Sequence, residues 1–182
     1  PLFHGSRGGA TVVSPYSGRV VENLYGGGLY TTTDVDVARS YGRGTAQRVE
    51  WTGINPPRVL DGDLPASPEI REAFRVATEL ADEAGVDEVE DFLAILDTPS
   101  SSVQNLMLSF RRLLLGQPRH DADEVMDVIR DTIQQDYDVV KYAGGQAGGK
   151  TGHDIYVLLD EEFMRFTGEA QAAVAVSDDE AI

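Results

Sequence analysis

The sequence predicts an α+β domain in which a helical block interrupts a β-rich part of the chain. Two hydrophobic patterns lead to this prediction. The first sixty residues and the residues after Tyr137 contain short segments in which apolar and polar residues alternate, as in half-buried strands. Residues 67–135 instead repeat apolar residues every three or four positions, and each segment opens with a capping signal. At 182 residues the chain fits one domain.

The first part of the chain predicts three short strands and one helix. Residues 2–3, 28–32 and 48–52 have strand character, and glycines stand among them. Asp34 is a good N-cap, and apolar residues recur at helical spacing from Val35 to Tyr41. A short helix therefore follows the second strand.

Four helices are predicted next. The first begins at Ser67, with Pro68 as its first residue, and stops at Gly85; the second covers residues 86–96. The third runs from a capping box at Ser101 to Leu115, and the fourth runs from Asp121 to Gln135.

Two further strands are expected at residues 138–142 and 155–159, joined by a loop over 144–152. Residues 168–182 are rich in alanine and acids and lack a long apolar face, so we expect a disordered acidic tail. The predicted single domain therefore covers residues 1–167, with a helical insertion at about 62–135.

Composition excludes several classes of protein. The net charge of −16 argues against passive binding to nucleic acid or anionic membranes. No stretch approaches the roughly 20 apolar residues of a membrane span. Without cysteine there is no disulfide, thiolate zinc site or cysteine nucleophile, and no metal site is predicted. No signal-peptide pattern opens the chain, so we expect a cytoplasmic location, in the producing or the target cell.

Acidic residues concentrate in the first two predicted helices. Between Ser67 and Asp97, ten acids stand against two arginines, a local balance of −8. A solvated helix face is the ordinary explanation for such a pattern. The alternative is a docking surface for a basic partner.

Residues 144–151 match the G-x-x-x-x-G-K-T phosphate-loop pattern. That loop binds phosphate because a helix begins at its Lys-Thr pair and directs its positive end at the anion. Here Gly152 and a strand-like run follow at once. We therefore expect a hairpin loop and not the phosphate-binding loop of a nucleoside triphosphatase.

Hydrogen-bonding groups gather near the start of the chain, in Phe3-His4-Gly5-Ser6-Arg7. An imidazole can bond a ribose hydroxyl, and a glycine backbone can pair with a carboxamide lying against it. Tyr30 and Tyr41 flank the short helix, where two rings could sandwich a planar heterocycle. These groups together suit nicotinamide.

The chain resembles the His-Tyr class of ADP-ribosyltransferases, the diphtheria-toxin and poly(ADP-ribose) polymerase type, and is similar to compact bacterial and phage members. The resemblance covers residues 1–61 and 137–165. Its motifs are Phe3-His4-Gly5-Ser6-Arg7, Gly26-Gly27-Gly28-Leu29-Tyr30-Thr31-Thr32, Ala38-Arg39-Ser40-Tyr41, Tyr137-Asp138-Val139-Val140 and the strand from Ile155 to Asp160.

The resemblance implies a split antiparallel sheet that grips NAD, the co-substrate, in an extended groove. By the same resemblance His4 would bind the adenosine-side ribose and the Gly5 backbone the nicotinamide carboxamide. Ser6, Arg7 and Thr32 would lie at the cofactor, and Tyr30 and Tyr41 would stack on the ring.

The sequence departs from the family at its catalytic glutamate, which opens the last strand of the motif. Ile155 falls at that position, and the nearest acid is Asp154, one residue earlier. Asp154 is our candidate for the role, provided that a bulge or the preceding loop turns it inward. With Ile155 at the position of the glutamate, the chain instead resembles family members that make single transfers or are inactive. Gln146 is a second polar candidate, in the loop that contacts the target in this family.

The resulting hypothesis is an NAD-dependent mono-ADP-ribosyltransferase acting on a macromolecular acceptor, as a bacterial or phage toxin or effector. An NAD glycohydrolase and a catalytically inactive NAD-binding module are the alternatives. Outside this motif, Trp51 is expected in the core, and His153 is expected to face solvent because neighbouring strand residues point apart.

Overall fold

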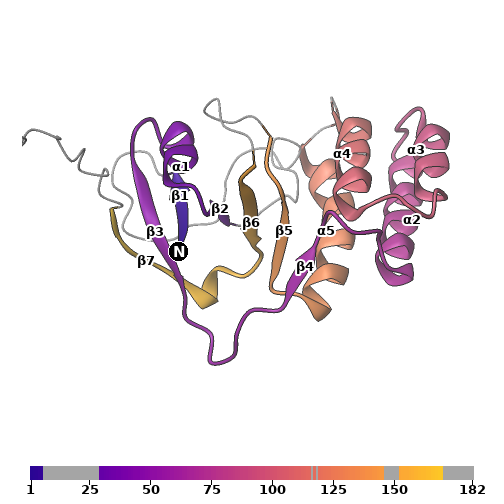
Figure 1. Cartoon of the computed structure of the whole chain (residues 1–182). Coiled ribbons are helices and arrows are strands. Elements are labelled where there is room, and N and C mark those ends of the chain that lie inside the picture. The colour runs from indigo at the N-terminus through magenta and orange to yellow at the C-terminus, as the bar shows by residue number, and fades with distance from the viewer. Residues whose placement is uncertain (6–28, 116, 118, 146–151, 170–182) are drawn as a thin grey trace, which may run out of the picture.

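The structure is a computed structural model that describes residues 1–5, 29–115, 117, 119–145 and 152–169. Seven strands of these residues form one mixed sheet, and four of the five helices stack together at one end of it (Figure 1). The strands are β1 (Leu2–Gly5), β2 (Leu29–Thr32), β3 (Ala46–Trp51), β4 (Val59–Asp61), β5 (Val139–Ala143), β6 (Asp154–Leu158) and β7 (Met164–Glu169). The helices are α1 (Val35–Tyr41), α2 (Pro68–Glu83), α3 (Val89–Leu96), α4 (Val103–Leu114) and α5 (Arg119–Asp136).

The predicted α+β class is confirmed, and local capping explains why the helices lie close to their predicted positions. The Asp34 carboxylate accepts hydrogen bonds from two backbone N–H groups in the first turn of α1. Ser67 caps α2 in the same way, and Pro68 is the first residue of that helix. Such bonds satisfy N–H groups that have no partner inside the helix.

Three helix starts differ from the prediction. Helix α3 begins at Val89 and not at residue 86, because Glu88 before it has the left-handed φ of 65°. Ser102, not Ser101, caps α4, because the Ser101 hydroxyl donates to the carbonyl of Ile95. Helix α5 begins two residues before Asp121.

The sheet has the order β4-β5-β6-β2-β1-β3-β7. Five of its six pairings are antiparallel, as predicted, but β4 and β5 are parallel. A parallel pair needs a long crossover connection, and the helical block between residues 62 and 138 supplies it. Arg58, just before β4, also holds Asp138, just before β5, through two side-chain hydrogen bonds of 2.9 and 3.2 Å.

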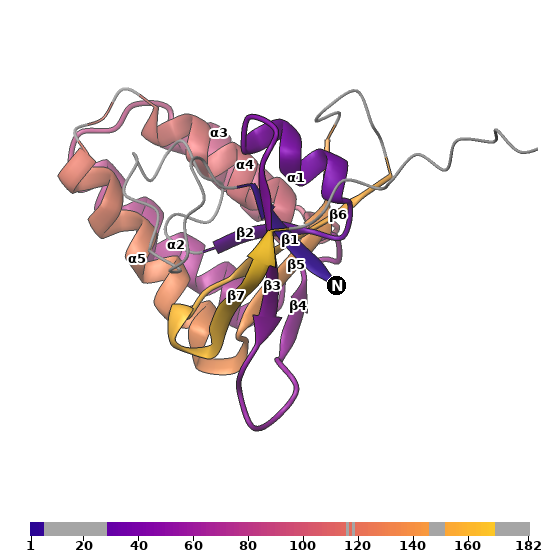
Figure 2. The same cartoon turned by 90° about the vertical axis from the view of Figure 1, so that its left-hand side faces the viewer.

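Strand β7 was not predicted. It forms the edge of the sheet beside β3 (Figure 2), and Arg165 on it pairs with Glu50 at 2.7 Å. It includes Gly168 and Glu169, two residues of the predicted tail. Pairing with β3, a contact distant in sequence, creates this strand where the local pattern is short. The rest of the predicted tail lies outside the described residues.

Apolar side chains form one cluster on each face of the sheet. The larger cluster joins the sheet to α2–α5 and contains Phe74, Phe92 and Phe110, whose ring centroids lie 5.1–5.9 Å apart. The smaller cluster covers the other face and contains Val49 and Leu158, with Trp51 packed against it as predicted. None of the described helices is long and apolar enough to cross a membrane.

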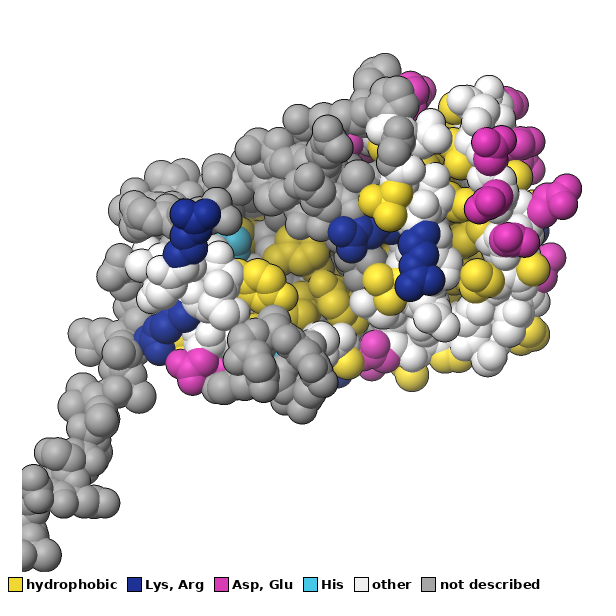
Figure 3. All heavy atoms as spheres, turned by 90° about the horizontal axis from the view of Figure 1, so that it is seen from above, with side chains coloured by type: hydrophobic (Ala, Val, Ile, Leu, Met, Phe, Trp, Pro, Cys, Tyr) yellow, Lys and Arg dark blue, Asp and Glu magenta, His cyan; other side chains and the backbone are white. Residues whose placement is uncertain are grey.

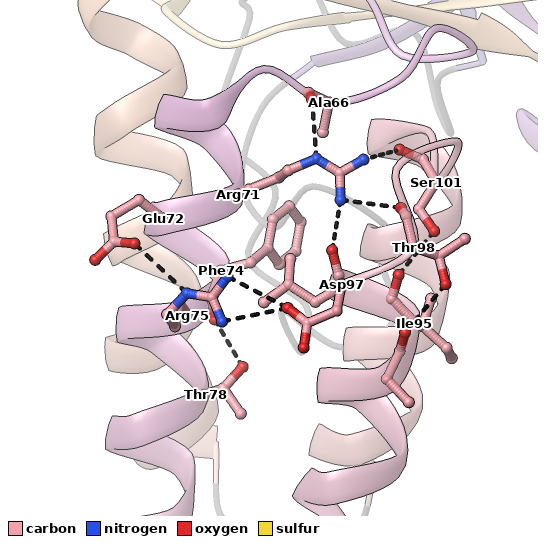
Figure 4. Close-up of polar contacts among 12 residues, drawn as sticks. Ala66, Arg71, Glu72, Phe74, Arg75, Thr78, Ile95, Asp97, Thr98 and Ser101 are labelled. Carbon is pink, nitrogen blue, oxygen red and sulfur yellow. Dashed lines mark hydrogen bonds and ion pairs between the residues drawn. The ribbon is translucent and has the colours of Figure 1, made fainter.

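One arginine ties the helices of the block together. The guanidinium of Arg71 on α2 donates hydrogen bonds to five backbone carbonyls, four at the α3–α4 connection and one just before α2 (Figure 4). The acceptors are Ala66, Leu96, Thr98, Pro99 and Ser101. All five N–H groups of the side chain are therefore used.

Candidate functional site

The two halves of the sheet meet at a narrow junction between β1 and β2. Among the described residues, Phe3 and Thr32 are the one pair there, whereas β1 pairs with β3, and β2 with β6, over four residues each. The His4 side chain crosses the junction, because its Nδ1 lies 2.8 Å from the carbonyl oxygen of Tyr30. The structure thus brings the His4 imidazole to the backbone of Tyr30, another of the predicted site residues.

This hydrogen bond defines the chemistry of His4. A carbonyl oxygen only accepts, so Nδ1 carries the proton, and in the neutral ring Nε2 is left as an acceptor. Burial lowers the pKa of the His4 imidazole below its ordinary value of 6.5, against a smaller opposing effect of the Tyr30 carbonyl. Phe166 on β7 stacks on the imidazole at 5.8 Å, with 14° between the planes. The ring is therefore fixed, neutral near pH 7, and able to accept a hydrogen bond from a hydroxyl.

We expect the His4 imidazole to titrate below pH 6.5 in the folded chain. Because the unfolded chain then binds more protons, His4 contributes stability above pH 6.5 that is lost as the pH falls through the folded pKa. Titration of the histidine C–H signals by NMR, assigned with a His4→Gln variant, measures this pKa. A value at or above 6.5 would contradict a buried, neutral ring.

Gly5 lies beneath α1. A Cβ at this position would stand 2.2 Å from the carbonyl oxygen of Ala38 and 2.7 Å from the backbone nitrogen of Gly42. Glycine is therefore required so that α1 can lie directly on β1. This packing role accounts for the glycine without any ligand, and its binding role stays a prediction.

The two predicted stacking tyrosines have different surroundings. Tyr30 is half-buried against the larger apolar cluster, and Tyr41 at the end of α1 is 61% exposed. Tyr142 on β5, which was not predicted as a site residue, lies near Tyr41. Burial raises the pKa of the Tyr142 hydroxyl, Tyr41 nearby raises it further, and Arg111 on α4 lowers it. The alternation of β5 was visible in the sequence, but the neighbours of Tyr142 come from α1 and α4 and were not.

Thr32 has a structural contact. It is buried, and its hydroxyl oxygen accepts a hydrogen bond of 3.2 Å from the backbone N–H of Asp34, the residue that caps α1. The hydroxyl thus fixes the turn between β2 and α1. A binding role for Thr32 stays a prediction.

Asp154 and Ile155 lie on opposite faces of β6. The ladders of β6 with β2 and β5 are regular, so no bulge turns Asp154 inward. Ile155 stands between Thr32 and Tyr142 and joins the apolar cluster against which Tyr30 packs. Asp154 is instead 3.9 Å from the Lys141 ammonium. The structure does not bring Asp154 together with Tyr30.

The expectation that His153 faces solvent is wrong. Its side chain is 5% exposed, and within the described residues neither ring nitrogen has a hydrogen-bond partner. Gly144 covers the ring, because a Cβ there would come within 2.2 Å of Nε2. Position 153 precedes the strand, so strand alternation did not govern it.

Several predicted residues lie outside the described part of the chain. These are Ser6, Arg7, Gln146 and residues 146–151 of the phosphate-loop match. The described residues that follow lead through Gly152 and His153 into β6, not into a helix. This path into a strand agrees with the prediction that the segment is not the phosphate-binding loop of a nucleoside triphosphatase.

Comparison of the chain with models of protein families, with curated proteins and with solved structures found no match.

Proposed function

We propose that this protein is an NAD-dependent mono-ADP-ribosyltransferase whose site lies at the junction of β1 and β2. The hydrogen bond from the His4 imidazole to the backbone carbonyl of Tyr30 carries the proposal, because it joins the two residues to which the resemblance assigns the ribose and the nicotinamide. The narrow junction supports it further, since a sheet whose described residues form one pair at its middle fits the split sheet that the resemblance implies.

The proposed reaction breaks the bond between nicotinamide and the ribose C1′. The bonding electron pair leaves with nicotinamide, C1′ becomes an oxocarbenium-like centre, and a nucleophile of the acceptor adds to C1′ and loses its proton. Neutral His4 would accept a hydrogen bond from a ribose hydroxyl at Nε2, and Tyr30 would stack on the leaving ring. These residues hold and orient NAD but do not stabilise the positive charge.

Ile155 limits the chemistry. An acid at this point would stabilise the developing positive charge, and an isoleucine cannot. In the proposed mechanism the acceptor supplies that acid, which restricts the enzyme to single transfers. The same observation favours a second candidate function, an NAD-binding module without turnover.

Labelled NAD incubated with the purified chain and a cell lysate tests the proposal. We expect a labelled acceptor, and a loss of at least about 100-fold in the initial rate for His4→Ala and Tyr30→Ala, because misplacement of a reactant by about 1 Å costs that much. The matched control for Tyr30→Ala is Tyr156→Ala. It removes a partly buried ring from β6, on the face of the sheet opposite to Tyr30, and is expected to keep most of the activity.

The products separate the alternatives. Free nicotinamide without a labelled acceptor would indicate a glycohydrolase. NAD binding without nicotinamide release would indicate the inactive module. Equal losses in Tyr30→Ala and Tyr156→Ala would remove the site from the β1–β2 junction.

A further inference from the structure

A second recess lies in the helical block, between α3 and α4. It has a volume of about 480 Å³ and is lined by residues 86–88 and by side chains from both helices. Phe92, Ile95 and Leu113 give it an apolar floor. We call it the α3–α4 groove. Since none of its lining residues belongs to β1 or β2, it is separate from the proposed NAD site.

Acidic side chains border this apolar floor. Asp87, Glu88 and Asp91 line one side, and Arg112 lines the other, which leaves the groove with a charge of −2. All three acids are exposed, and the Glu88 carboxylate makes no capping bond to α3. Figure 3 shows acidic side chains gathered over the helical end of the molecule, with apolar side chains among them.

A solvated helix face explains acids but not the apolar surface beside them. Leu115, at the end of α4, lines the groove and is 57% exposed, and Leu113 on the floor is partly exposed. Exposed leucine next to carboxylates suits a ligand with an apolar group flanked by positive charges. Phosphate-bearing ligands do not suit it, because the whole 67–97 segment carries −8.

We propose that the α3–α4 groove binds a basic amphipathic segment of a partner protein. An apolar side chain of that segment lies on Phe92 and Leu113, and lysine or arginine side chains on either side of it face Asp87, Glu88 and Asp91. The proposal does not depend on the NAD activity of the other site.

The probe is a synthetic helical peptide of leucine and lysine with a single apolar stripe. Fluorescence anisotropy with the full chain measures its binding. A leucine–glutamate peptide of the same pattern tests charge, and a scrambled leucine–lysine peptide tests the apolar stripe. We expect the patterned basic peptide to bind at least about tenfold more tightly than either.

Two triple variants locate the site. Asp87→Asn with Glu88→Gln and Asp91→Asn is expected to weaken binding about tenfold, since each rim charge contributes modestly. The control, Glu79→Gln with Glu124→Gln and Asp131→Asn, removes the same charge at exposed helix positions outside the groove and is expected to change binding less than about twofold. Backbone NMR shifts on α3 and α4 confirm the location.

A pair of single variants tests the apolar contact. Leu115→Ser is expected to weaken binding several-fold, and Leu108→Ser, at an exposed leucine outside the groove, is not. Equal weakening by both triple variants would reduce the attraction to overall charge and overturn the proposal. Equal binding of the scrambled peptide, or no binding of the basic peptide, would overturn it as well.

Discussion

Replacement of Arg71 by alanine is expected to lower the free energy of unfolding by about 3 kcal/mol. Three of its five carbonyl acceptors are partly buried, those of Ala66, Leu96 and Ser101, and each loses a charge-assisted bond that water replaces only in part. The two exposed acceptors can turn to water and add little. Urea unfolding followed by circular dichroism measures the change.

Arg75, one turn further along α2, is the matched control. Its contacts with Glu72 and Asp97 are 3.5 Å long and exposed (Figure 4), and such pairs contribute about 0–1 kcal/mol. Arg75→Ala should therefore cost less than about 1 kcal/mol. Arg71→Lys should resemble Arg71→Ala more than the native chain, because an ammonium cannot reach five carbonyls. Similar losses for the two alanine variants would show that the carbonyl contacts of Arg71 do not hold the helical block together.

The second large effect is expected from Gly5→Ala. The new methyl group would stand 2.2 Å from the carbonyl oxygen of Ala38, so α1 must move away from β1. Overpacking of this kind costs about 1–3 kcal/mol, and a backbone oxygen cannot move aside as a flexible side chain does, so we expect a value of about 3 kcal/mol. Urea unfolding gives the free energy, and NMR shifts of α1 report the movement.

Gly85→Ala provides the comparison. Gly85 has a φ of 83° and no heavy atom within 4 Å of the position of an added Cβ, so only the left-handed backbone opposes the substitution, at about 1–2 kcal/mol. A Gly5→Ala variant as stable as the native chain, with unshifted α1 signals, would refute the close packing of α1 on β1.

The helices were predictable because their signals are local. Asp34 and Ser67 cap helices through atoms two or three residues away, so four or five letters of sequence contain the whole interaction. Strand β7 depends on a partner strand about 115 residues earlier in the chain, and the parallel pairing of β4 with β5 joins residues 80 positions apart. No short sequence pattern contains either contact.

The candidate site was predictable only in part, for the same reason. The resemblance placed His4 and Tyr30 in one site, and strand alternation indicated that Asp154 and Ile155 face opposite ways. The burial of His153 under Gly144, and the place of Tyr142 near Tyr41 and Arg111, arise from segments brought together by folding. These surroundings could not be deduced from the sequence alone.

Binding of NAD at the β1–β2 junction is the claim on which the proposed function depends. Saturation-transfer NMR with the purified chain and NAD tests it most directly, because it detects contact with the nicotinamide ring whether or not turnover follows. We predict saturation of the nicotinamide and ribose protons with the native chain, and its loss with Tyr30→Ala but not with Tyr156→Ala. Absence of saturation with the native chain, or equal saturation with Tyr30→Ala, would contradict an NAD site at this junction.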